Sequence, residues 1–234
     1  MPLISVIMPV KNGSKLIEAS LISVFRNTSL EDEVIVVDDG SDDDTIQKIN
    51  ALAIQSKRSI RVIKTASAGP ARARNIGIEI ATGEFITFLD HDDLWPKNRI
   101  KNHLDFFKSD PSIDLVVGKV QPFENDLNGR RINVSKKTHH VHLGATTFRR
   151  SLINAMEGFK SEYLFSEDLD FFTRIREGDF NFYFDNKIAL YYRRHESNMT
   201  NNSNQKIMHF TLRALLDSVK RRKNLTALKP FKNQ

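Results

Sequence analysis

The sequence predicts an α/β protein with a mostly parallel central sheet that helices cover on both faces. Strands that are apolar throughout alternate with stretches of helical periodicity, as expected when strands are buried on both faces. Three of these strands end in polar residues. Parallel sheets bind ligands beyond the carboxyl ends of their strands, so we expect these polar segments to converge on one crevice.

The regular alternation occupies the first half of the chain. We expect strands at residues 4–8, 34–37, 60–63 and 84–89. Helices are expected at residues 14–27, from about residue 43, at 70–80 and from about 96 to 108. Residues 9–12, 38–41 and 90–93 are the polar segments at the carboxyl ends of three of these strands, here called the polar strand exits, and we expect them to meet.

The second half is less regular. Residues 121–144 are polar, contain turn formers such as Asn125 and Gly129, and include a basic, histidine-rich run. This composition indicates a mobile excursion rather than a separate domain. Beyond it we expect a strand at 145–148, a helix at 168–177, strands at 181–184 and 188–193, and an amphipathic helix after residue 204.

The composition is typical of one soluble domain. A chain of 234 residues, 40% of them hydrophobic, can bury a full core. The chain has no cysteine, so disulfides and thiolate metal sites are excluded. The absence of cysteine is consistent with a reducing compartment. The first apolar run is too short for a signal peptide, and no window has the length of a membrane span. We therefore expect a cytoplasmic protein.

The net charge of +6 is concentrated near the carboxyl end, where residues 206–234 carry many lysines and arginines against Asp217 alone. Such a tail can meet an anionic membrane, a nucleic acid or an acidic partner, or can be only a solvated helix face. The basic cluster has no interleaved aromatic residues and no nucleic-acid motif, which argues against nucleic acid. Peripheral contact with the inner face of a membrane is the functional alternative to a solvated face.

The run FLDHDD at residues 88–93 places Asp90, Asp92 and Asp93 directly after an apolar strand. Carboxylates repel one another and are costly to desolvate, so such a cluster normally has a compensating cation. Carboxylate oxygens suit Mg²⁺ or Mn²⁺, which keep further sites for water or phosphate oxygens. The run therefore predicts a metal and diphosphate site, with an acidic turn that caps the helix near Pro96 as the alternative.

The motifs, taken in order, resemble the GT-A glycosyltransferases of family 2. The matching segments are ISVIMPVKN at 4–12, VVDDGS at 36–41, GPARARNIG at 69–77, FLDHDD at 88–93, FSED at 165–168 and YRRH at 192–195. The resemblance covers roughly residues 3–200. It implies a GT-A domain at 1–200, with a nucleotide-sugar-binding half at 1–118 and an acceptor-binding, catalytic half at 119–200, followed by a basic helix and tail at 201–234.

The resemblance implies roles for the acidic run. The last carboxylate of the Asp-x-Asp element, Asp92, would hold Mn²⁺ or Mg²⁺, and Asp90 would face the donor's ribose with His91 beside the donor. His195 would complete the metal or diphosphate site. Asp93 either assists or caps the helix at Pro96. The cation would neutralise the charge that builds up on the leaving diphosphate.

The resemblance also implies a nucleotide pocket. Asp39 would accept a hydrogen bond from a uracil N–H, Asp38 would brace the loop, and Pro9, Val10 and Asn12 would border the base. Lys11 departs from the family pattern, which usually has an aromatic residue there, and this weakens the case for UDP. Between Arg72 and Arg74, we expect Arg74 to point at the diphosphate.

Asp168 is the expected catalytic base. Inversion at the anomeric carbon requires a carboxylate opposite the leaving group, where it takes the proton of the acceptor hydroxyl. The alternative is that Glu167 and Asp168 are only the acidic first turn of a helix. Residues 144–150 resemble the strand that floors the acceptor site, and residues 139–142 are expected to form an acceptor lid rather than a metal site.

The expected activity is therefore the inverting transfer of a sugar from a nucleotide sugar, with UDP favoured, to a hydroxyl of a saccharide or lipid-linked acceptor. Assembly of a surface polysaccharide or glycolipid is the expected context. Sugar-1-phosphate nucleotidyltransferases are an alternative, but they normally have a glycine-rich phosphate loop after the first strand, and residues 9–14 lack one. A non-catalytic nucleotide-sugar-binding module is the other alternative.

Overall fold

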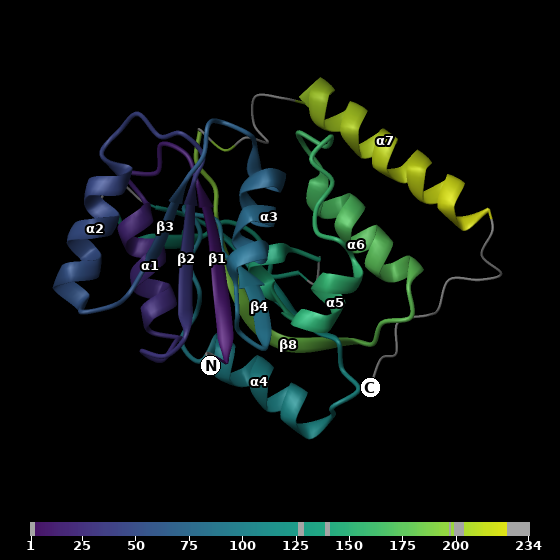
Figure 1. The fold of residues 1–234 in the computed structure, drawn as a ribbon, viewed down its shortest axis with the longest axis horizontal. Helices are drawn as coiled ribbons and strands as arrows, with labels where there is room; N and C mark the ends of the chain where they lie inside the picture. Colours follow the sequence, from purple (N-terminus) through teal and green to yellow (C-terminus); the bar gives the residue numbers. More distant parts are fainter. Residues whose placement is uncertain (1–2, 126–128, 139–140, 197, 199–203, 224–234) are drawn as a thin grey trace.

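A single mixed sheet of eight strands forms the centre of the protein (Figure 1). The computed structural model describes residues 3–125, 129–138, 141–196, 198 and 204–223. The strand order is β3-β2-β1-β4-β7-β5-β6, and β8 pairs with β5. The strands are β1 (Ile4–Val10), β2 (Glu33–Asp38), β3 (Arg61–Lys64), β4 (Phe85–Phe88), β5 (Leu115–Asn125), β6 (Arg131–Asn133), β7 (Thr146–Arg149) and β8 (Phe182–Arg193).

Strands β3, β2, β1 and β4 are parallel to one another, as the apolar runs predict. Two clusters of buried residues cover the opposite faces of the sheet. Helices α1 (Ile17–Phe25), α2 (Thr45–Ser56) and α4 (Arg99–Ser109) pack on one face, and α3 (Pro70–Ile80), α5 (Arg150–Ala155) and α6 (Glu167–Glu177) on the other. The predicted α/β fold class is thereby confirmed.

Helix α3 approaches the sheet very closely at Gly77. A Cβ on this residue would collide with Cγ2 of Ile7, a buried residue of β1. Only a glycine therefore lets the helix lie this deep. The contact between Gly77 and Ile7 therefore sets how close α3 and its side chains lie to the sheet.

The second half is more ordered than the sequence indicates. We expected an irregular excursion at residues 121–144, but strand β5 continues through the first part of it and ends at Asn125. Strand β6, which also lies in this range, pairs antiparallel with β5. The two strands expected at 181–184 and 188–193 are one strand, β8, with register shifts where it pairs with β5. The division drawn between residues 118 and 119 falls inside β5. Residues 126–128 and 139–140 of the expected excursion lie outside the described residues.

The acidic run does not cap a helix. Helix α4 begins at Arg99, after Asn98 in the left-handed conformation, and not at Pro96 as expected. The capping alternative for Asp93 is therefore wrong. Its Oδ1 instead accepts a hydrogen bond from the backbone N–H of Arg193, 2.8 Å away at the end of β8.

The expected amphipathic helix is α7 (Asn204–Arg222), and it packs along α6 at one side of the molecule (Figure 1). In the described part of the chain, no helix combines the length and apolar character needed to cross a membrane.

We predict that the protein loses stability in mild acid because of His103, a fully buried residue of α4 whose Nδ1 lies 2.9 Å from Thr147 Oγ1. Burial, with a smaller contribution from Arg99, lowers the pKa of His103 well below 6.5. The unfolded chain then binds more protons than the native state as pH falls through 6.5. His103 therefore favours the native state fully above this pH, and its contribution declines below it.

His103→Gln should reduce the slope of the free energy of unfolding against pH by up to about 1.4 kcal/mol per pH unit. Urea unfolding measured at several pH values between 5 and 8 tests it, and His209→Gln, at an exposed site on α7, is the matched control. Equal slopes for His103→Gln and the unsubstituted protein would refute the assignment.

Candidate active site

The three polar strand exits meet at the carboxyl edge of the parallel strands, as predicted. The backbone N–H of Asn12 donates to Ser41 Oγ at 2.8 Å, and the N–H of Asp42 donates to the Asn12 side chain at 2.9 Å. On the other side, Gly13 packs so closely on the His91 ring that a Cβ would come within 2.6 Å of it. The loops after β1, β2 and β4 therefore form one continuous rim.

On the expected nucleotide side, Asp39 braces a loop. Its carboxylate accepts hydrogen bonds from the backbone N–H groups of Ala68 and Gly69, at 2.7 and 2.8 Å, and from the Thr65 hydroxyl. Lys11 donates to Ser67 Oγ at 3.0 Å, so it too is joined to this loop. The loop at 65–69 thus lies against both residues.

The remaining residues expected at the base surround this loop junction. Pro9 and Val10 are the last residues of β1, buried beside Val37 and Asp38 of β2. Asp38 lies within weak hydrogen-bonding distance of the Ser41 N–H. The structure brings these residues together, and their contact with a base stays a prediction.

The acidic loop after β4 is held from two sides. The Ser20 hydroxyl of α1 lies 2.7 Å from the carbonyl oxygens of both His91 and Asp93. From β8, Arg193 bonds through its backbone to Asp93 and through Nε to the carbonyl oxygen of Asp92 at 2.7 Å. These bonds fix the direction in which the carboxylates point.

Two sets of side chains, each of which combines carboxylates of this loop with a histidine from another segment, could hold a divalent cation. The first is the predicted pair, in which Asp92 Oδ2 lies 3.0 Å from His195 Nε2. The second is a group of Asp90, Asp93 and His142, whose ligand atoms lie within 4.8 Å of one another. The sequence interpretation had placed His142 in an acceptor lid and not near a metal.

Both sets fit a hard cation chemically. Asp93 Oδ2 is buried without a hydrogen-bond partner among the described residues, and burial together with Asp92 and Asp90 raises the pKa of Asp93 well above its usual value. An uncompensated buried carboxylate of this kind is the environment that a cation would relieve. The side chains of Asp92 and His195 are 17% and 24% exposed, so this pair opens on the crevice whereas Asp93 is only 1% exposed.

Arg74 occupies the floor between the two halves of the site. Its guanidinium donates to Asp90 Oδ1 at 2.8 Å and to Glu167 Oε1 at 2.5 Å, and the residue is buried. Although burial alone would raise it, the pKa of Asp90 is held below its usual value by Arg74. The two carboxylates engage Arg74, so its expected contact with a diphosphate stays a prediction.

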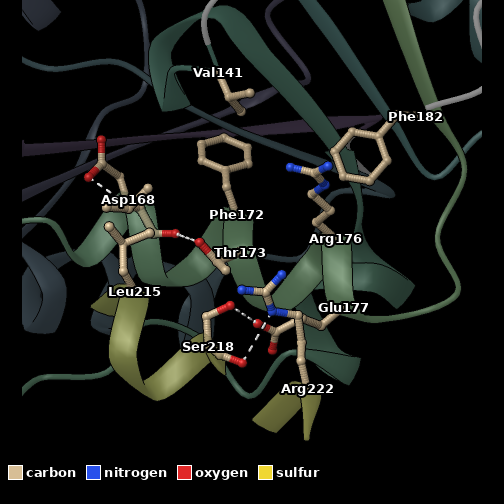
Figure 2. A pocket seen from close by; sticks show the side chains of 11 residues that line it. Val141, Asp168, Phe172, Thr173, Arg176, Glu177, Phe182, Leu215, Ser218 and Arg222 are labelled. Atoms are coloured by element: carbon tan, nitrogen blue, oxygen red, sulfur yellow. Dashed lines mark hydrogen bonds between the residues drawn. The ribbon is translucent and has the colours of Figure 1, made fainter. Parts of the chain in front are cut away.

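Asp168 lies in the first turn of α6, beside Glu167, and lines a cavity of about 350 Å³ between α6 and α7 (Figure 2). In Figure 2, Asp168 lies at one end of the cavity, Arg176 and Arg222 lie toward the other, and Phe172 lies between them. Charge interactions reach from Asp168 to Arg74 and His142. Arg74 and His142 both lie beside Asp90, so the expected base interacts with neighbours of the acidic loop and is open to a partly apolar cavity.

Sequence comparison identifies the family. The family model described as "Glycosyl transferase family 2" matches residues 5–160, so the chain belongs to this family and the predicted resemblance is confirmed. The chain is 32% identical over 180 residues to the Escherichia coli protein WfgD, named a UDP-Glc:alpha-D-GlcNAc-diphosphoundecaprenol beta-1,3-glucosyltransferase. This match covers 71% of the chain and 66% of WfgD. The chain spans 17% to 66% of the length of five curated relatives that it matches.

Solved structures have the same GT-A fold. Staphylococcus aureus TarS 1–349 in complex with UDP-GlcNAc superposes with a TM-score of 0.74 over 93% of this chain and 66% of TarS, at 24% identity. The Pyrobaculum calidifontis mannosyltransferase PcManGT, in complex with GDP-Man and Mn²⁺, gives a TM-score of 0.71 over 97% of this chain and 76% of its own, at 18% identity. At these identities the likeness concerns the fold alone.

The sequence interpretation did not assign three residues that the structure places in the site. Arg193 was quoted only as part of a motif, although it fastens the acidic loop. Glu167 was considered only as part of the acidic first turn of a helix, and it is the partner of Arg74. His142 immediately precedes the short 3-10 helix Leu143–Ala145, and nothing in the local sequence indicates that it lies beside Asp90.

We predict that Arg74→Gln lowers the free energy of unfolding by about 3–5 kcal/mol, because it leaves the buried Glu167 and the partly buried Asp90 without their counter-charge. Chemical denaturation measures this loss. Arg72→Gln, on the exposed side of the same helix, is the control and should change stability by less than about 0.5 kcal/mol. The double variant Arg74→Gln/Glu167→Gln should recover part of the loss, and equal stability of the Arg74 and Arg72 variants would contradict the assignment.

Proposed function

We propose that this protein is an inverting glycosyltransferase that moves a sugar from a UDP-sugar to a hydroxyl of a saccharide or lipid-linked acceptor. Membership in glycosyl transferase family 2 is the observation that carries the proposal. It is supported by the contacts that join the nucleotide-side loops to the acidic loop, and by the electrostatic interactions of His142 with both Asp90 and Asp168. WfgD, whose name specifies a UDP-sugar and a lipid-linked acceptor, supports a context in surface polysaccharide or glycolipid synthesis.

In the proposed reaction, the acceptor hydroxyl oxygen bonds to the anomeric carbon while the bond from that carbon to the diphosphate oxygen breaks. Asp168 takes the hydroxyl proton, and the nucleoside diphosphate leaves with the electron pair. Asp168 suits this task because it opens on the cavity, where an acceptor has room. Asp90, His91 and the loops around Asp39 and Asn12 would hold the donor on the opposite side.

The cation is proposed to be Mn²⁺ or Mg²⁺, held by Asp92 and His195. A divalent cation at this place would supply positive charge to the leaving diphosphate. We favour this pair over the Asp90, Asp93 and His142 group because a cation that binds donor oxygens needs an open side. Asp93 is buried and already accepts a hydrogen bond from Arg193. PcManGT, solved with Mn²⁺, supports metal use in this fold.

A thermal-shift screen tests the donor. UDP-, GDP- and dTDP-sugars are compared with and without Mn²⁺, because a ligand that binds only the folded state raises the melting temperature. We expect UDP-sugars with Mn²⁺ to give the largest rise. A larger rise with another nucleotide would reassign the base and give Lys11 a role in that choice.

We predict that Asp92→Asn and His195→Gln weaken Mn²⁺-dependent binding of UDP by about tenfold or more, measured by calorimetry. His142→Gln is the matched comparison and should leave the affinity nearly unchanged. If His142→Gln abolishes binding and His195→Gln does not, the cation belongs to the Asp90, Asp93 and His142 group instead.

We predict that Asp168→Asn retains UDP binding but lowers transfer by about 10²–10⁴-fold, because the amide cannot take the acceptor proton. Release of nucleoside diphosphate in the presence of acceptor measures the rate, and Glu162→Gln, an exposed substitution before α6, is the control. A fully active Asp168→Asn variant would remove Asp168 from the chemistry. If instead the unsubstituted protein binds donor but shows no turnover, the non-catalytic binding module becomes the better explanation.

A further inference from the structure

Helix α7 exposes a row of large apolar side chains and packs its opposite side, which carries Phe210, Ala214 and Ser218, against the protein. Ala214 and Ser218 are buried, whereas five large apolar side chains are 45% to 60% exposed. These five are Met208, Leu212, Leu215, Leu216 and Val219. Their spacing of four, seven, eight and eleven residues from the first places them along one face of the helix, which we call the α7 stripe.

Several polar contacts help to hold the opposite face against the protein. The Tyr163 hydroxyl donates to Asp217 at 2.7 Å, and the Ser218 hydroxyl donates to Glu177. Arg221 also pairs with Glu177, at 2.5 Å. A surface helix normally docks through its apolar side, as α1 does with Ile17, Leu21 and Val24. In α7 the docked side combines these polar contacts with Phe210, whose ring lies 6.4 and 6.1 Å from the rings of Tyr163 and Phe165, and within the described residues the stripe stays largely exposed.

The charges beside the stripe define the chemistry of that partner. Asp217 is the only acidic residue of α7, and it faces the protein, where it bonds to Tyr163. Arg213 and Lys220 pair with Asp217 at 3.9 and 3.3 Å, yet their side chains stay 44% and 73% exposed, and Lys223 just beyond the helix is exposed. An apolar stripe with a basic flank is the pattern of helices that lie in the interface of an anionic bilayer.

The stripe also adjoins the candidate site. Leu215 belongs to it and lines the cavity that contains Asp168, together with Ser218 and Arg222 of the same helix (Figure 2). A surface that binds the stripe would therefore lie beside the cavity. An acceptor sugar carried on a lipid could then reach Asp168 while its lipid stays in the bilayer.

We propose that α7 is an interfacial membrane helix: the α7 stripe inserts among the acyl chains of an anionic bilayer and the basic flank meets the headgroups. The link to a lipid-carried acceptor rests on the proposed function, whereas the membrane contact does not. A second copy of this chain is a poorer partner. Two-fold pairing through the stripe would bring Arg213 and Lys220 of both copies to the same boundary, where like charges repel.

Cosedimentation with vesicles tests the proposal. The full chain is mixed with vesicles of phosphatidylcholine alone or of phosphatidylcholine with phosphatidylglycerol, and the bound fraction is measured. We expect the unsubstituted chain to bind the anionic vesicles. The partition coefficient of Leu212→Glu/Leu216→Glu should be at least about tenfold lower than that of the unsubstituted chain, because the two charged side chains cannot enter the acyl region. Ile54→Glu, at an 80% exposed apolar site on α2, is the matched control and should bind like the unsubstituted chain.

Three outcomes would overturn the proposal. These are no binding of the unsubstituted chain to anionic vesicles, equal binding of the stripe variant, and a dimer in light scattering that the stripe variant dissolves. Circular dichroism and UDP affinity, which should be unchanged in the variant, show that it is folded. If the chain binds vesicles through the stripe but binds no nucleotide sugar, the proposed function fails and the membrane contact stands.

Discussion

Arg74 carries its charge inside the protein, between Asp90 after β4 and Glu167 at the start of α6. A buried guanidinium is costly unless carboxylates surround it, and buried carboxylates are costly without it. The three groups therefore stabilise one arrangement of α3, the acidic loop and α6. Since Asp168 follows Glu167 directly, the same ion pairs set where the expected base stands relative to the expected donor site.

The second half of the sheet completes this arrangement. Strand β8 returns parallel to β5 and ends beside the acidic loop, where Leu94 and Tyr191 form a bridge and Arg193 bonds to the loop backbone. A loop that carries three carboxylates is thus fastened by α1 on one side and by β8 on the other. These bonds hold the carboxylates close to one another even when no cation is bound. A cation site must keep this arrangement of like charges before the cation arrives.

Much of the fold could be predicted because its signals are local. Apolar runs such as residues 34–37 identify strands, and the order of the strand exits identifies their common edge. The missed features depend on contacts between distant residues. Nothing near Arg193 in the sequence indicates that it bonds to residues 92 and 93, and the start of α4 at Arg99 depends on the left-handed Asn98. Periodicity likewise predicted α7 but not which of its faces would be exposed, since polar contacts to α6 decide it.

The close contact at Gly77 links the interior of the sheet to the site. Arg74 precedes Gly77 by one helical turn on α3, so the depth of the helix sets how far the guanidinium reaches toward Asp90. A single methyl group at position 77 would push the helix away from Ile7 and shift Arg74 with it. The geometry of the carboxylates is therefore encoded partly in a residue that has no polar side chain and never meets a ligand. Screening for inactive variants should find position 77 as sensitive as the charged residues themselves.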